Sequence, residues 1–123
     1  MAERYVLLVS DDNHLAEEAS YSFPSDLDVK VSRDGPGAWI YMNESAPEVA
    51  ILEIRSGNSG GPSLAEEMRQ REILRDVPIL MLLERPQDEW LAMQAGATAT
   101  RIQPIEASDL VAEALALIVA APS

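Results

Sequence analysis

The chain has 123 residues, a formal net charge of −12, no cysteine and a single histidine. The missing cysteines exclude disulfides and thiolate metal sites, and one histidine excludes a multi-histidine metal centre. The negative charge would repel nucleic-acid phosphates, so no direct nucleic-acid binding is expected. The amino-terminal residues do not read as a secretory signal, and no apolar run is long enough to cross a bilayer. These features predict a cytoplasmic protein without membrane contact.

Short apolar runs alternate with amphipathic stretches along the chain. The runs predict strands over residues 5–9, 27–31, 49–54, 77–83 and 99–102, and the stretches predict helices over 13–22, 36–45, 63–74, 86–95 and 108–119. Nearly continuous apolar strands are typical of a parallel sheet that is covered on both faces. The strict alternation predicts one doubly wound α/β domain over residues 1–123.

Polar residues follow several of the predicted strands. Asp11 and Asp12 follow the first strand, Glu53 ends the third and Glu84 follows the fourth. Functional groups of such folds gather at the carboxyl edge of the sheet, so we expect these four side chains to form an acidic pocket. The glycine-rich segment "GNSGG", residues 57–61, lacks the lysine of a phosphate-cradling loop and is interpreted as a turn.

Several segments, in this order, resemble the receiver domain of two-component response regulators. They are "VLLVSDD", "DGPGAWIYMNESAPEVAILEI", "DVPILMLLE" and "AMQAGATATRIQPIEASDL". The resemblance covers essentially the whole chain. It implies a flavodoxin-like sheet of five parallel strands in the order 2-1-3-4-5 with five helices, and a cis bond before Pro104.

The resemblance also implies a phosphorylation site, from which this sequence departs. In active members, an aspartate after the third strand is phosphorylated by a histidine kinase, and an acidic pair holds Mg²⁺ beside it. A hydroxyl, a lysine and an aromatic residue complete the switch. Asp11 and Asp12 match the acidic pair. The remaining positions hold other residues: Glu53 for the phosphoacceptor, Leu83 for the hydroxyl, Gln103 for the lysine and Thr100 for the aromatic residue.

These replacements argue against phosphoryl transfer, which depends mainly on positioning and charge stabilisation. Glu53 is one methylene longer than aspartate, Gln103 carries no charge and Leu83 offers no polar contact. We therefore expect a non-enzymatic pseudo-receiver that acts by protein–protein contact, independently of phosphorylation. One alternative is a working but unorthodox phosphoreceiver that uses Glu53 or Asp12 with Mg²⁺. Another is a regulatory domain that binds a small ligand or cation in the acidic crevice.

The predicted acidic pocket needs relief from charge repulsion, because no lysine lies near it in the sequence. Three kinds of relief are open: a cation held by Asp11, Asp12 and Glu53, protonation of one carboxylate, or an approach of Arg55 or Arg85. No cofactor is required, and Mg²⁺ is the candidate cation. Glu53 itself has three interpretations: a mimic of phosphorylated aspartate, a cation ligand, or a residue without a role.

A partner surface is expected on the fourth helix, fifth strand and fifth helix, the face through which receivers commonly associate. The last helix carries a core stripe of Leu110, Ala114, Leu117 and Ile118. A second apolar stripe and two residues of the fourth helix exceed what one buried face needs. These residues are Val111, Leu115, Val119, Trp90 and Leu91. They predict binding of a protein partner or a second copy, and the alternative is a broad core-facing surface.

Overall fold

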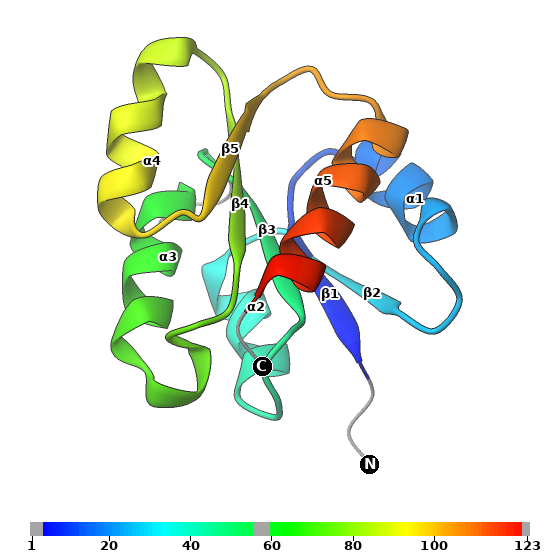
Figure 1. Cartoon of the computed structure of the whole chain (residues 1–123), viewed down its shortest axis with the longest axis horizontal. Coiled ribbons are helices and arrows are strands. Elements are labelled where there is room, and N and C mark those ends of the chain that lie inside the picture. Colours follow the sequence, from blue (N-terminus) through cyan, green and yellow to red (C-terminus); the bar gives the residue numbers. More distant parts are fainter. Residues whose placement is uncertain (1–3, 56–59, 122–123) are drawn as a thin grey trace.

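The computed structural model describes residues 4–55 and 60–121. Five parallel strands form one sheet in the order β2-β1-β3-β4-β5 (Figure 1). The strands are β1 (Tyr5–Val9), β2 (Asp28–Ser32), β3 (Val49–Glu53), β4 (Ile79–Leu83) and β5 (Ala99–Ile102). The predicted fold class and strand order are confirmed.

Helices connect the strands and cover both faces of the sheet (Figure 1). The α-helices are α1 (Asn13–Ser22), α2 (Gly35–Met42), α3 (Gly60–Gln70), α4 (Glu89–Ala95) and α5 (Ala107–Ala120). Two predicted helices are divided. An extended residue, Arg71, separates α3 from the 3₁₀ turn η1 (Glu72–Leu74), and the 3₁₀ turn η2 (Pro86–Asp88) precedes α4. No helix in the described part of the chain is long and apolar enough to span a membrane.

The core consists of two clusters, one on each face of the sheet. Successive side chains of a strand point to opposite faces. Ala50 and Leu52 of β3 accordingly join the cluster under α2, α3 and α4, whereas Val49 and Ile51 join the cluster under α1 and α5. The continuous apolar strands of the sequence are therefore explained by burial on both sides.

Two side chains near the carboxyl edge of the sheet are the N-caps of the first two helices. The Asp12 carboxylate accepts a hydrogen bond of 3.1 Å from the Leu15 backbone N–H, and the Asp34 carboxylate accepts one of 2.8 Å from Gly37. Each contact satisfies an otherwise unpaired N–H of the first helical turn. The Gln103–Pro104 bond at the same edge is cis, as expected.

Candidate functional site

Glu53 lies at the end of β3, where it connects two neighbouring loops. The Asp11 backbone N–H donates to Glu53 Oε1 over 3.1 Å, and the Gln103 side-chain amide donates to Glu53 Oε2 over 2.7 Å. Asp11 belongs to the loop between β1 and α1, and Gln103 to the turn between β5 and α5. Both carboxylate oxygens are thus held by neutral N–H donors.

Asp12, one residue of the expected acidic pair, makes two contacts close to it in the sequence. The Asp12 carboxylate caps α1, while the Asp12 backbone N–H donates to the Ser10 hydroxyl over 3.0 Å. Ser10 is buried directly after β1, whereas Asp11 is exposed. One oxygen of the Asp12 carboxylate is thus engaged by its own helix, and an acidic pair of Asp11 and Asp12 beside Glu53 stays a prediction.

Glu84, the fourth acidic residue of the predicted pocket, forms an ion pair with an arginine. Arg55 Nε lies 3.3 Å from Glu84 Oε2, and both side chains are largely exposed. Arg85 instead pairs with Asp88 over 3.1 Å. An approach of Arg55 was one of the expected kinds of relief. The hydrogen bonds from neutral donors to Glu53 were not among them.

Leu83 and Thr100 also have defined surroundings. The Leu83 side chain is buried in the cluster under α2, α3 and α4, and its carbonyl accepts from the Gln103 backbone N–H over 2.8 Å. The Thr100 hydroxyl donates to Glu89 Oε2 over 3.0 Å. The side chain at the end of β4 is therefore apolar and buried, and Thr100 of β5 makes a polar contact with the first residue of the fourth helix.

These contacts do not fit the Mg²⁺ ion that the resemblance implies. Across residues 4–55 and 60–121, no group of three or more histidine, aspartate or glutamate side chains is arranged to hold a metal ion. Of the three proposed ligands, Asp12 caps a helix and Glu53 accepts N–H donors with both oxygens. The predicted set of Asp11, Asp12 and Glu53 is not assembled.

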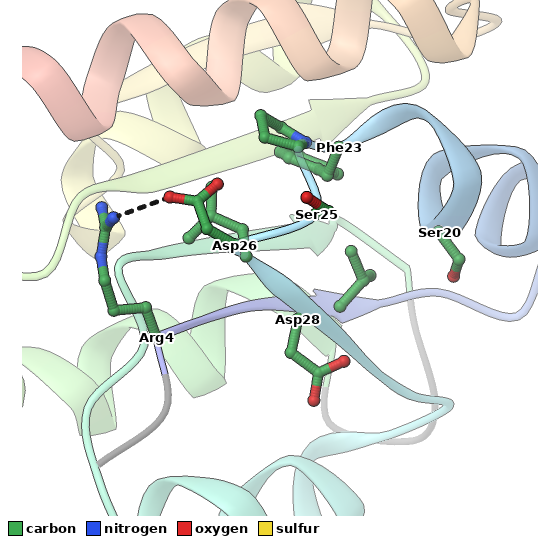
Figure 2. A pocket seen from close by; sticks show the side chains of 9 residues that line it. Arg4, Ser20, Phe23, Ser25, Asp26 and Asp28 are labelled. Atoms are coloured by element: carbon green, nitrogen blue, oxygen red, sulfur yellow. Dashed lines mark hydrogen bonds and ion pairs between the residues drawn. The ribbon is translucent and has the colours of Figure 1, made fainter. Parts of the chain in front are cut away.

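Two hollows flank the sheet at its opposite ends. One, of about 400 Å³, lies beside the site and is lined by Asp12, Leu15, Glu84, Gln103, Pro104 and Ile105. The other, of about 550 Å³, lies at the amino ends of β1 and β2, where Arg4 pairs with Asp26 over 3.4 Å (Figure 2). Only the first hollow includes residues of the predicted site.

A glycine packs against the backbone of Glu53, a feature that the sequence interpretation missed. A Cβ atom on Gly61 would lie 2.6 Å from the Glu53 carbonyl oxygen and 2.6 Å from Met81 Sδ. The absence of a side chain thus lets the first turn of α3 approach β3 closely. The sequence signal for this close approach was the pair Gly60 and Gly61, which follows the strand that ends at Glu53. Residues 57–59 of the "GNSGG" segment lie outside the described part.

The predicted partner surface is partly exposed. Trp90 is 71% exposed and Val119 is 87% exposed, whereas Val111 is only 7% exposed and packs in the core. Leu115 is half-buried against the same core. The expectation that Val111 faces a partner is therefore wrong, because α5 turns that position toward the sheet. Leu91 and Met93 of α4 and Ile102 of β5 are also exposed.

Comparisons with known proteins agree with this geometry. No protein-family profile matches the chain. The sensory transduction protein RegX3 of Mycolicibacterium smegmatis is 24% identical over 116 residues, which cover 92% of this chain and 50% of the relative. The response regulatory protein Rv3143 of Mycobacterium tuberculosis is 32% identical over 72 residues, covering 58% of this chain and 53% of the relative. The chain thus spans about half the length of the curated relatives it matches.

A solved receiver structure establishes the same fold. The receiver domain of the sensor histidine kinase PA1611 from Pseudomonas aeruginosa carries a magnesium ion in its active site cleft. It matches with a TM-score of 0.82 at 23% identity, over 97% of this chain and 100% of that one. The sheet order and the acidic residues at its carboxyl edge define a receiver-type α/β domain. The matched relatives support the resemblance of the chain to the receiver domains of response regulators.

Proposed function

We propose that this receiver domain acts in two-component signalling through protein contacts, without being phosphorylated. The observation that supports the proposal best is the environment of Glu53. Its two carboxylate oxygens accept from the Asp11 backbone N–H and from the neutral Gln103 amide. A carboxylate with a donor on each oxygen links the two loops, and each hydrogen bond withdraws electron density and so lowers its nucleophilicity.

The surroundings also lack the groups that phosphoryl transfer needs. The transferred group spreads negative charge over its oxygens, so catalysis depends on cationic or hydrogen-bonding partners in fixed positions. Leu83 offers none at the end of β4, and Gln103 already donates to Glu53. A misplacement of roughly an ångström costs about a hundredfold in rate, and Glu53 is longer than aspartate by a methylene.

The decisive experiment is incubation with acetyl phosphate and Mg²⁺, followed by intact-mass measurement. We expect no phosphoryl adduct on the natural chain. The matched positive control is the triple variant Glu53→Asp, Leu83→Thr and Gln103→Lys, which restores the reactive residue types in the same fold. A labile adduct on the natural chain that maps to Glu53 or Asp12 would instead establish the unorthodox phosphoreceiver.

The proposed contact surface lies on α4, β5 and α5. It consists of the exposed apolar residues Trp90, Leu91, Met93, Ile102 and Val119. Exposed apolar side chains that gather on one face are typical of interaction sites, and an aromatic residue is a frequent energetic anchor. β5 is an edge strand of the sheet, and no further strand in the described part of the domain pairs with it.

A second copy of the chain is the simplest partner to test. We expect Trp90→Glu and Val119→Glu to abolish self-association in sedimentation velocity while leaving the circular dichroism spectrum unchanged. Tyr21→Glu is the matched control, because Tyr21 is 84% exposed on α1, away from the proposed surface. If the natural chain is monomeric at every concentration measured, the homodimer is excluded, and the proposed surface would bind a different protein.

A further inference from the structure

Helix α4 is held at its amino-terminal end by a residue of β5. The Thr100 hydroxyl donates to Glu89 Oε2 over 3.0 Å, and Glu89 is the first residue of the helix. Thr100 is half-buried on the edge strand, so its side chain has little freedom to move away. The contact therefore couples the first turn of α4 to the sheet.

The carboxyl-terminal end of the same helix is held by a residue of α3. The Gly96 carbonyl accepts from Arg69 Nε over 3.0 Å and from Arg69 Nη2 over 2.8 Å. Arg69 also donates to the carbonyls of Arg75 and Val77 over 2.8 and 2.6 Å. Because the guanidinium is planar and uses several donors at once, it fixes Gly96 relative to the loop that enters β4.

The packing of α4 makes these end contacts important for its position. The helix has only seven residues, and those that it buries are alanines, Ala92 and Ala95. Small side chains contribute little packing energy, because the energy of burial grows with the apolar area removed from water. The placement of such a short helix thus depends strongly on what holds its two ends.

We propose that the Thr100–Glu89 and Arg69–Gly96 contacts fix α4 in one position, so that Trp90 is presented to a partner without any signal. This inference deepens the proposed function, because α4 carries the central aromatic residue of the proposed surface. Thr100 occupies the place of the aromatic switch, and its hydroxyl engages the helix that bears Trp90. We call these two contacts, Thr100–Glu89 and Arg69–Gly96, the α4 latch.

The test is hydrogen exchange of the α4 amides in the full chain. Thr100→Val removes the hydroxyl at nearly constant shape, and we expect exchange across residues 89–95 to accelerate about 2- to 10-fold, the range for the loss of one net hydrogen bond. Thr100→Ser retains the hydroxyl and should restore slow exchange. Glu113→Gln is the matched control, since Glu113 lies on α5 and pairs with Arg101 of β5 over 2.9 Å.

Two outcomes would overturn the latch. One is unchanged exchange of α4 in Thr100→Val. The other is an equal acceleration throughout the domain, which would show a general loss of stability and no specific restraint on α4. Both outcomes are read on chains that have not been treated with acetyl phosphate, so they are distinct from the phosphorylation experiment. A phosphorylated natural chain with a restrained α4 would refute the proposed function and leave the latch intact.

Discussion

At the scale of single residues, Glu53 shows how one side chain connects two loops of the site. Its carboxylate reaches donors on two loops, the Asp11 backbone N–H and the Gln103 amide. Hydrogen bonds to an ionised acceptor are about twice as strong as those between neutral groups. The Glu53 carboxylate thus connects the first and last loops of the site.

Replacement of Glu53 by glutamine should weaken that connection. The amide has an NH₂ group in place of one carboxylate oxygen, so a donor would face either the Asp11 N–H or the Gln103 amide. We expect Glu53→Gln to lower the free energy of unfolding by about 1–2 kcal/mol in urea denaturation. Glu84→Gln is the control, because the exposed Arg55–Glu84 pair contributes less than about 1 kcal/mol. Equal effects of the two variants would contradict this role for Glu53.

At the scale of elements, the strands could be predicted from the sequence because burial on both faces demands continuous apolar runs. The division of the third and fourth predicted helices could not be predicted. In the third, for example, Arg71 takes an extended conformation that its residue type does not require. The sequence interpretation missed the N-cap role of Asp12, although an aspartate directly before a predicted helix is a signal for it. The contacts of Gln103 were beyond reach, because they depend on side-chain geometry between distant loops.

The end of α4 allows a direct test of an element boundary. Gly96 has a φ of 111°, and a Cβ atom there would lie 2.8 Å from Arg69 Cγ. We expect Gly96→Ala to destabilise the domain by about 1–3 kcal/mol, through backbone strain and displacement of the arginine. Gly35→Ala is the control, since a Cβ atom there meets nothing within 4 Å. Urea midpoints of both variants provide the comparison, and a tolerated alanine at position 96 would contradict the role of this glycine.

At the scale of the whole molecule, the sheet divides the core into two clusters that must unfold together, since β1, β3 and β4 contribute to both. Tyr5 of β1 lies in this shared part, and its hydroxyl donates to the Ser45 carbonyl over 2.5 Å. Burial of the phenol raises the pKa of Tyr5 to about 12, and the nearby Glu44 carboxylate acts in the same direction. A buried group with a raised pKa makes the stability of the entire domain depend on pH.

The sign of that dependence follows from the protonation states. An unfolded tyrosine ionises near pH 10, whereas Tyr5 in the folded chain keeps its proton until about pH 12. Its contribution to stability is therefore fully present below pH 10 and is lost as the pH rises to 12, with about 1 kcal/mol gone by pH 11. In urea titrations at several pH values, Tyr5→Phe should lose stability less steeply over this interval than the natural chain. Tyr21→Phe, which removes a phenol that is 84% exposed, should retain the steep loss. Parallel curves for the natural chain and Tyr5→Phe would show that ionisation of this phenol does not govern alkaline unfolding.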